Sequence, residues 1–297
     1  MRKLLFLSVL SLGILRVGAQ QYFPNEIPPG NYSGICPIGN NRYAVVSDKS
    51  PEDGFFVFHI ELDTLRGRIA SISNEGFRSS GKPNCDMEAI CYCPKTNTVF
   101  IASEQQSEVY EYTLEGKRTG RQLQMPAVFK KANKNYGLES LTFDPVSQQF
   151  FTTTERPLSG DSLHRIQVFN AKLQPTRQYL YPSDQPLSSK HIYGVSELCA
   201  LGNGQMLVLE RQVFIPESKI GATTLIRIYE VTLGQKERLE KHLVKEFTTK
   251  LTLFGRKFAN YEGLCMLSPD YMLLIADSQD QYAGVLRDWF YVLNVKM

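Results

Sequence analysis

One short motif recurs five times along the chain, and this recurrence limits the folds that the chain can adopt. Each copy leads into an apolar run, and one shared position of the copies carries Ser or Glu: Ser33, Glu88, Glu139, Ser196 and Glu262. Successive copies are 55, 51, 57 and 66 residues apart, close to the length of one four-stranded propeller blade. A repeat that cannot bury its own apolar face must stack on its neighbours. The sequence therefore predicts an all-β fold, a five-bladed β-propeller.

Four strand-like segments separated by turn residues can be recognised in these repeats. The first follows the shared position, as at 138–143 and 197–201. The second is the most apolar, at 43–46, 99–102, 150–153, 206–209 and 272–276. The third is rich in aromatic and β-branched residues, at 55–60, 109–113, 165–169, 225–231 and 289–295. The fourth is more polar and suits an outer edge, at 68–72, 121–125, 177–181 and 242–247.

The fifth repeat lacks a fourth strand, because the chain stops soon after 289–295. The segment 20–27 precedes the first repeat and has no other place, so we expect it to supply the missing strand. Pairing the two ends of the chain in one blade closes the circle and protects its edges. Six blades remain the alternative if the long interval before Glu262 contains a further unit. No linker divides 20–297, which reads as a single domain.

The N-terminal segment has the composition of a secretory signal peptide. Arg2 and Lys3 are followed by an apolar run at 4–15 and by small residues up to Ala19, where we expect cleavage. The protein is therefore predicted to be secreted or periplasmic. The apolar run is too short to span a bilayer, so no membrane span is expected.

Charge excludes some partners. Lys and Arg number 33 against 30 Asp and Glu, so no overall field points to nucleic acid or to a membrane surface. We expect a monomer whose ligand is recognised locally. The chain also lacks a Gly-Lys-Ser/Thr phosphate loop, a Gly-x-Ser-x-Gly nucleophile motif and a His-Glu-x-x-His metal motif.

Six cysteines in an exported chain raise the question of disulfides. Four of them lie three residues after the shared position of their repeat: Cys36, Cys91, Cys199 and Cys265. A recurring position favours small buried residues that pack between repeats, because free Cys behaves as a small hydrophobe. Cys85 and Cys93 lie outside this register, and a local bridge between them stays open.

The shared positions also predict a metal site. In a propeller, equivalent residues of the innermost strands surround a central channel, so these five side chains form a ring that we call the axial ring. Three Glu side chains in one ring disfavour one another's ionisation unless a cation is present. Ca²⁺ takes about 6 to 8 oxygen ligands and fits this set, with Mg²⁺ or Mn²⁺ as second choices. The alternative is that these acids accept hydrogen bonds from backbone N–H groups where blades begin.

A second set of acids lies 14 to 16 residues after the axial ring, at the ends of the second strands: Asp48, Glu104, Glu155, Glu210 and Asp277. A hairpin returns the chain to the end of the blade where it began, so both sets should lie at one mouth of the channel. Lys49, Arg156 and Arg211 follow three of these acids, and the loops before the axial ring add Lys134 and Arg256.

These cations predict an anionic ligand, because arginine matches phosphate oxygens with two parallel hydrogen bonds. We expect Lys49, Arg156, Arg211, Lys134 and Arg256 to bind a phosphorylated small molecule. Glu155 and Glu210 would orient a water molecule or a second ion, while Arg156 and Arg211 would also stabilise charge in the transition state.

Three pairs of motifs carry a family resemblance: 193–198 with 207–211, 136–141 with 154–156, and 261–264 with 275–277. In these motifs the chain resembles the phytase-like propeller family, known for an esterase-like activity of phytase. The resemblance implies an exported propeller that hydrolyses phosphoric esters. The order Ser, Glu, Glu, Ser, Glu around the axis is similar to that of calcium-activated nucleotidases, five-bladed propellers with a central Ca²⁺. That similarity implies the axial ring as the calcium ligands.

The leading hypothesis from the sequence is an exported, calcium-dependent phosphoric-ester hydrolase that is phytase-like or nucleotidase-like. One rival is a non-enzymatic propeller with structural calcium whose mouth binds an anionic glycan, peptide or protein. Another is a metal-dependent lactonase, which would cleave uncharged lactones and ignore phosphates.

Overall fold

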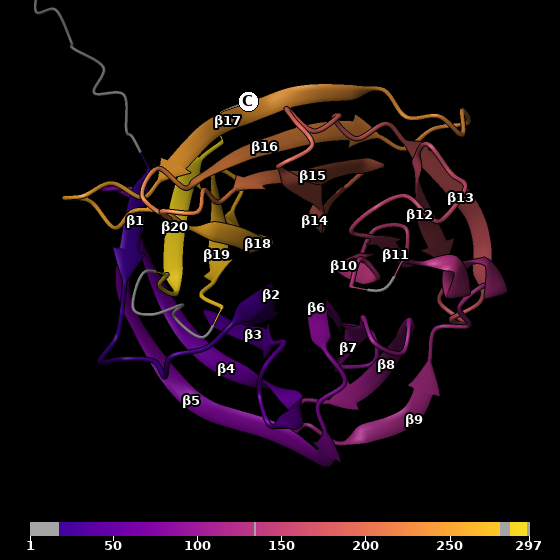
Figure 1. Ribbon diagram of the computed structural model, residues 1–297. Helices are drawn as coiled ribbons and strands as arrows, with labels where there is room; N and C mark the ends of the chain where they lie inside the picture. The colour runs from indigo at the N-terminus through magenta and orange to yellow at the C-terminus, as the bar shows by residue number, and fades with distance from the viewer. Residues whose placement is uncertain (1–17, 134, 280–285, 296–297) are drawn as a thin grey trace, which may run out of the picture.

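The computed structural model describes residues 18–133, 135–279 and 286–295. Its strands form five four-stranded antiparallel sheets arranged in a ring around a central channel (Figure 1). The prediction of an all-β, five-bladed propeller is therefore confirmed. Residues 1–17, which contain most of the expected signal peptide, lie outside the described residues, as does Lys134.

Within each of the first four blades the strands follow chain order from the axis outward. The first two blades contain β2 (Tyr32–Gly39), β3 (Arg42–Ser47), β4 (Glu52–Asp63), β5 (Arg68–Pro83), β6 (Met87–Cys93), β7 (Thr98–Ser103), β8 (Glu108–Thr113) and β9 (Arg118–Gln122). The next two contain β10 (Leu138–Asp144), β11 (Gln149–Thr154), β12 (His164–Phe169), β13 (Pro175–Tyr181), β14 (Ile192–Gly202), β15 (Gln205–Phe214), β16 (Thr223–Thr232) and β17 (Lys241–Lys250). A short 3₁₀ helix, η1 (Ala127–Lys131), follows β9.

The fifth blade combines the two ends of the chain. Its inner strands are β18 (Asn260–Ser268), β19 (Tyr271–Asp277) and β20 (Trp289–Asn294), and β1 (Ala19–Tyr22) is added at the outer edge. β1 pairs antiparallel with β20, with Tyr22 opposite Trp289. The expected closure by the N-terminal segment is confirmed. Because β1 covers the free edge of β20, the last blade ends in the same four-stranded form as the others.

The outer strand of the second blade starts earlier than the sequence predicted. We expected 121–125, whereas β9 spans Arg118–Gln122. The reason is the tight turn after β8, in which Thr113 N–H donates to Lys117 O and Gly116 takes a φ of 89°. This turn lets strand pairing resume directly at Arg118, opposite Tyr112.

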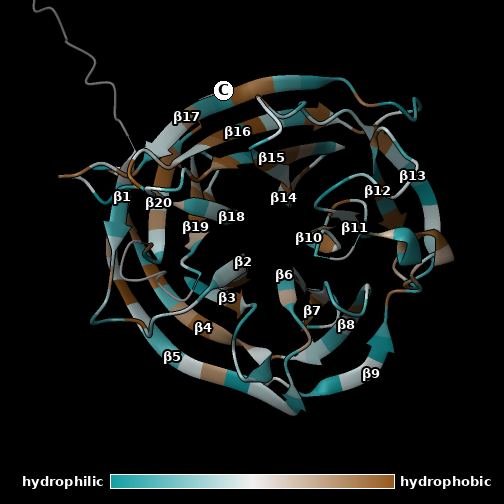
Figure 2. Ribbon diagram, in the orientation of Figure 1, coloured by the Kyte–Doolittle hydropathy of each residue, from teal (hydrophilic) through white to brown (hydrophobic). Residues whose placement is uncertain are grey.

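The apolar core lies between neighbouring blades, where the faces of their sheets meet. Tyr32 and Phe58 of the first blade pack with Ile275 and Phe290 of the fifth, and all four are buried. Burying each of these side chains contributes about 1.5–3 kcal/mol, so this cluster joins the first and last blades firmly. Hydrophilic residues gather instead on outer strands such as β9 and β13 (Figure 2).

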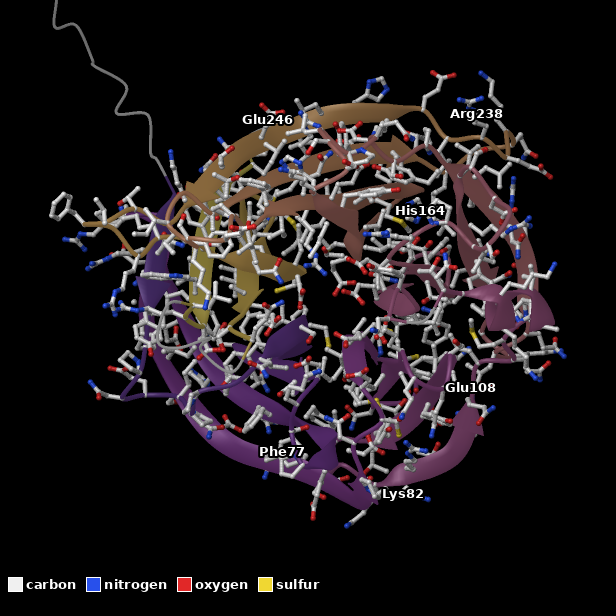
Figure 3. The ribbon with its side chains drawn as sticks, viewed as in Figure 1. Phe77, Lys82, Glu108, His164, Arg238 and Glu246 are labelled. Atoms are coloured by element: carbon white, nitrogen blue, oxygen red, sulfur yellow. The ribbon has the colours of Figure 1, made fainter. Side chains whose placement is uncertain are left out.

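Charged side chains far from the axis mark the rim of the disc. Lys82, Glu108, Arg238 and Glu246 lie at this rim, while His164 lies inside it (Figure 3). Among the described residues, no helix is long and apolar enough to cross a membrane.

Candidate metal centre

Every axial-ring residue occupies a β-bulge at the start of the innermost strand of its blade. The pairing with the second strand shifts between Tyr32 and Gly34, and equivalent shifts flank the other ring residues. A bulge leaves its extra residue unpaired and redirects the side chain. Ser33, Glu88, Glu139, Ser196 and Glu262 are thereby removed from the ladder, and all five are buried.

The bulges bring the three glutamates of the axial ring together. Carboxylate oxygens of Glu88, Glu139 and Glu262 lie within 4.8 Å of one another. A second group with the same spacing consists of Asp48, Asp86 and Glu88, so Glu88 belongs to both. Asp86 was not among the predicted residues. It occupies the position two residues before Glu88, where its φ is 60°, a left-handed conformation that Asp tolerates.

Both groups face one cavity of about 360 Å³ at the mouth of the channel. We call it the carboxylate cavity. Its lining residues are Asp48, Lys49, Asp86, Glu88, Glu104, Asn135, Glu139, Glu155, Glu262, Asp277 and Gln279. The prediction that both sets of acids share one mouth therefore holds for these residues.

The second set of acids is one residue out of register in the fourth blade. On each innermost strand, the residue two positions before the ring residue faces a residue of the second strand. In the fifth blade, for example, Asn260 lies opposite Asp277, a member of the second set. In the fourth blade the corresponding pair is Gly194 and Arg211, while Glu210 pairs with Val195. The set around the channel is therefore Asp48, Glu104, Glu155, Arg211 and Asp277. Spacing alone selected Glu210, but the strand register gives this place to Arg211.

Glu210 consequently points away from the carboxylate cavity. Its carboxylate accepts hydrogen bonds from Tyr181 Oη at 2.5 Å and from the backbone N–H of Asp184 at 2.9 Å. Lys241 Nζ lies 2.7 Å from the Oε1 atom of the same carboxylate. These contacts tie Glu210 to the packing of the third and fourth blades, and Glu210 does not line the cavity.

Arg211 places a buried guanidinium among the acids of the channel. Its Nη2 lies 3.1 Å from Glu139 Oε1, 3.2 Å from Glu155 Oε1 and 2.9 Å from Glu262 Oε1. Its Nε donates to Ser196 Oγ at 2.7 Å, and its Nη1 donates to Asn260 Oδ1 at 2.8 Å. Burial opposes this charge, but Glu262, Glu155 and Glu139 outweigh burial and raise the pKa of Arg211.

The guanidinium of Arg211 does not offset the effect of burial on the acids of the cavity. Burial, followed by neighbouring carboxylates, raises the pKa of Glu88 and of Glu139 well above the ordinary value. Burial also raises the pKa of Glu262, although Arg211 opposes this shift. For Asp48, burial and Asp277 raise the pKa to about 6 against the opposing effect of Lys49. The cavity thus favours any bound cation that lets these carboxylates ionise.

The donors present fit a hard divalent cation. Asp48 Oδ1 is buried and has no hydrogen-bond partner among the described residues, which is a costly state for a carboxylate oxygen. The two groups around Glu88 supply only carboxylate oxygens, the ligands that Ca²⁺ and Mg²⁺ prefer. Arg211 contacts Glu139, Glu155 and Glu262, and Lys49 contacts Asp48 and Asp86. Glu88 has no such contact among the described residues, so it has the largest need for a cation.

The predicted phosphate-binding cations occupy different places. Lys49 lines the cavity, with its Nζ 2.6 Å from Asp48 Oδ2 and 3.3 Å from Asp86 Oδ1. Arg156 stacks between two aromatic rings, 3.8 Å from the centre of Tyr136 and 4.7 Å from that of Tyr193. Its Nε donates to Tyr193 O at 3.3 Å, while its two Nη atoms have no partner among the described residues. Arg256 is exposed in the loop before β18.

The chain is therefore a five-bladed propeller with a polyanionic site at one mouth of its channel. The chain belongs to the phytase-like family: residues 27–278 match the family described as "Esterase-like activity of phytase". The match covers most of the propeller, including both sets of channel residues. No curated protein matches the sequence.

Two solved structures resemble the chain at low sequence identity. The catalytic domain of a GH62 α-L-arabinofuranosidase from Coprinopsis cinerea superposes with a TM-score of 0.52 at 10% identity, over 94% of each chain. The PQQ-bound aldose sugar dehydrogenase from Streptomyces coelicolor gives a TM-score of 0.47 at 10% identity, over 93% of this chain and 98% of that one. The arabinofuranosidase match shows a likeness of fold, and at 10% identity it carries no information about substrate.

Proposed function

We propose that the protein is a calcium-dependent phosphoric-ester hydrolase whose site is the carboxylate cavity. One observation carries the proposal: two adjacent rings of channel residues contain seven carboxylates, Glu88, Glu139, Glu262, Asp48, Glu104, Glu155 and Asp277, and one guanidinium, Arg211. A packed protein does not hold so many acids together unless a cation compensates them. Membership of the phytase-like family supports a hydrolytic role.

Glu88, Asp48 and Asp86 would hold the Ca²⁺, with Glu139 and Glu262 in reach on the other side of Glu88. When bound, this ion would supply a Lewis acid that draws charge from phosphate oxygens and lowers the pKa of water. Arg211 would keep Glu139, Glu155 and Glu262 in place, because each accepts a short contact from its Nη2.

The substrate phosphate would bind at the rim of the cavity. The free Nη atoms of Arg156 are already oriented by stacking on Tyr136 and Tyr193, so little entropy is lost when they pair with phosphate oxygens. Lys49 would add a second positive charge from the cavity wall. These two cations would stabilise the negative charge that develops on the phosphate in the transition state.

Glu104 is the best-placed general base. Its Oε1 accepts a hydrogen bond from Gly137 N–H at 2.7 Å, which fixes the carboxylate against the cavity. Burial raises its pKa, opposed by this hydrogen bond, and a raised pKa strengthens a carboxylate as a proton acceptor near neutral pH. Glu104 would take a proton from the attacking water.

The proposal is tested by measuring phosphate release from phytate, a nucleoside diphosphate and an aryl phosphate, each with Ca²⁺ and with chelator. We expect release from at least one substrate with Ca²⁺ only, and its loss in Glu104→Gln. Glu115→Gln, an exposed acid on the turn after β8, is the matched control and should keep full activity. Absence of release from all three substrates in both conditions would reject hydrolysis and favour a non-enzymatic anion-binding propeller.

A further inference from the structure

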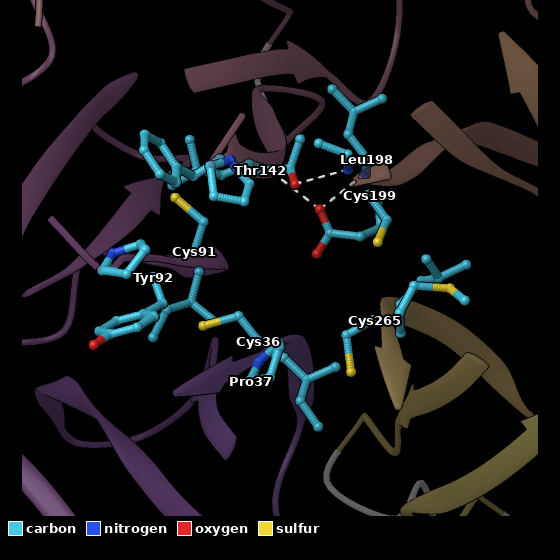
Figure 4. Close-up of a pocket in the computed structure, with 18 residues that line it drawn as sticks. Cys36, Pro37, Cys91, Tyr92, Thr142, Leu198, Cys199 and Cys265 are labelled. Carbon is cyan, nitrogen blue, oxygen red and sulfur yellow. Dashed lines mark hydrogen bonds between the residues drawn. The ribbon is translucent and has the colours of Figure 1, made fainter. Parts of the chain in front are cut away.

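The channel ends at its other mouth in a second cavity of about 250 Å³, shown in Figure 4. Four cysteines with Thr142 surround its centre, and we call it the thiol chamber: Cys36, Cys91, Cys199 and Cys265. These residues follow the axial ring by three positions, which at about 3.3 Å per residue places them roughly 10 Å further along the channel. Among the described residues, none lines both the thiol chamber and the carboxylate cavity.

The walls of the thiol chamber are largely apolar. Ile35, Ile90, Leu141, Leu198 and Leu264 occupy equivalent positions of the five innermost strands, and all of them line the chamber. Thiols add to this surface, because sulfur is polarizable and behaves as a hydrophobic contact. The walls are therefore suited to contact the hydrocarbon part of a ligand.

Glu197 is the exception among the lining residues. It follows the bulge at Ser196, and the equivalent positions in the other four blades carry the small residues Gly34, Ala89, Ser140 and Gly263. Only 2% of Glu197 is exposed, yet it lines the chamber. A carboxyl group here replaces a residue that elsewhere has almost no side chain, so its presence needs a chemical reason.

The hydrogen bonds of Glu197 leave one oxygen unused. The backbone N–H groups of Leu141 and Leu198 both donate to Oε1, at 3.1 Å and 2.9 Å. Oε2 has no partner among the described residues. A buried carboxylate of this kind is costly unless a donor or a cation pairs with it.

Two other uses of the chamber are disfavoured. A thiolate metal site needs its ligands to converge on one ion, but among the described residues no set of three that includes a cysteine has its ligand atoms within 4.8 Å. The six cysteines also carry free thiols, so the four around the chamber are not paired as disulfides. What remains is an apolar cavity with one acidic group.

We propose that the thiol chamber binds a small apolar amine in its protonated form. The ammonium group would donate to Oε2 of Glu197, and the hydrocarbon part would lie against the leucine, isoleucine and cysteine side chains. An ammonium supplies both the positive charge and the hydrogen-bond donors that this oxygen lacks. The chamber is slightly smaller than ordinary drug-sized pockets of about 300–1,000 Å³, so a single ring or a short chain fits best.

The test compares three compounds of one shape: cyclohexylamine, cyclohexanol and cyclohexanecarboxylate. With chelator present, we expect only the amine to raise the melting temperature of the protein in a concentration-dependent way. Glu197→Gln should abolish this rise, because a neutral amide cannot pair with an ammonium. An equal rise with cyclohexanol, or an unchanged rise in Glu197→Gln, would overturn the proposal.

A second measurement on the wild-type chain keeps the proposal testable if the variant does not fold. Maleimide labelling followed by peptide mass spectrometry reports each thiol separately. At ten times its Kd the amine should slow the labelling of Cys36, Cys91, Cys199 and Cys265 roughly tenfold, since about one tenth of the protein is then unbound. Cys85 and Cys93 are buried but do not line the chamber, so their labelling should slow less than that of the four chamber cysteines. Unchanged labelling of all six would contradict amine binding in the chamber.

Discussion

Gly194 on β14 lies opposite Arg211 on β15, at the register position that places a carboxylate beside the channel in the other four blades. The fourth blade therefore contributes a fixed cation where its neighbours contribute anions. Arg211 thereby compensates three carboxylates from within the protein, Glu139, Glu155 and Glu262.

Removing this cation should destabilise the metal-free protein. Replacing Arg211 with Gln leaves Glu139, Glu155 and Glu262 without their shared partner, and breaking a buried ion pair costs about 3–5 kcal/mol. Urea denaturation in chelator should show this loss. Arg66→Gln, which changes an exposed arginine on the turn between β4 and β5, should alter the free energy of unfolding by less than about 0.5 kcal/mol.

The acids also predict how stability depends on pH. Burial raises the pKa values of Glu88, Glu139 and Glu262, so the folded state binds more protons than the unfolded state. Without metal, these acids should therefore lower stability as pH rises above 4.5, the ordinary value for Glu, and above about 6.5 His164 does not oppose them. His164 acts oppositely at lower pH: burial lowers its pKa to about 4, so its contribution is lost as pH falls from about 6.5 through 4.

Saturating Ca²⁺ should cancel or reverse the fall above pH 6.5, because the ion binds the ionised carboxylates of the folded state. Melting temperatures measured with Ca²⁺ and with chelator across this range would show the effect. Parallel curves in the two conditions would mean that no ion is linked to these acids.

Close packing between blades should depend on glycine at one position. A Cβ atom added to Gly194 would lie 2.5 Å from the backbone oxygen of Glu155, so Gly194→Ala should push the third and fourth blades apart. Overpacking of this kind costs about 1–3 kcal/mol. Gly234→Ala meets no atom within 4 Å and is the matched control. Equal stability of the two variants in urea would contradict the predicted contact.

The proposed phosphate contact predicts a kinetic change. Arg156→Gln removes two free donors from the residue that follows Glu155, and the loss of one charged hydrogen bond costs about 1.5–3 kcal/mol. On a phosphate ester that the wild type hydrolyses, kcat/KM should fall roughly 10- to 150-fold. Arg66→Gln should leave it unchanged, and an equal fall in both variants would indicate a general effect of charge.

The periodicity of the sequence was sufficient to predict the propeller architecture and the residues of the axial ring. Ile or Leu recurs two residues after each ring residue, so Glu88, Glu139 and Glu262 could be aligned without a structure. The structure brings their carboxylate oxygens within 4.8 Å of one another. The closure of the ring by β1 could also be predicted by counting strands, because the fifth repeat contains only three of the four strands of a blade.

Strand register could not be predicted in the same way. The second-set residues follow the ring by variable intervals, and a one-residue slip moves a side chain to the opposite face of a strand. This slip separates Glu210, which contacts Lys241, from Arg211, which contacts the ring. The bulges that produce the variation are set by pairing with the neighbouring strand and leave no clear mark in the sequence.

Two functional candidates escaped detection because they lie next to the aligned position. Asp86 lies two residues before Glu88, and Glu197 lies one residue after Ser196. At the positions of Asp86 and Glu197, the other repeats carry different residue types. A comparison of the repeats column by column would have shown these departures, but only the structure shows that Asp86 faces the carboxylate cavity and Glu197 the thiol chamber.

Isothermal titration of chelator-treated protein with Ca²⁺ tests the proposed metal centre most directly, using Glu88→Gln and the exposed-site control Glu115→Gln. Glu88 belongs to both carboxylate groups, so we predict saturable binding to the wild type and an affinity roughly 10- to 100-fold lower in Glu88→Gln. Glu115→Gln should bind as the wild type does. Absence of saturable binding to the wild type, or equal affinity in all three proteins, would contradict a calcium site in the carboxylate cavity.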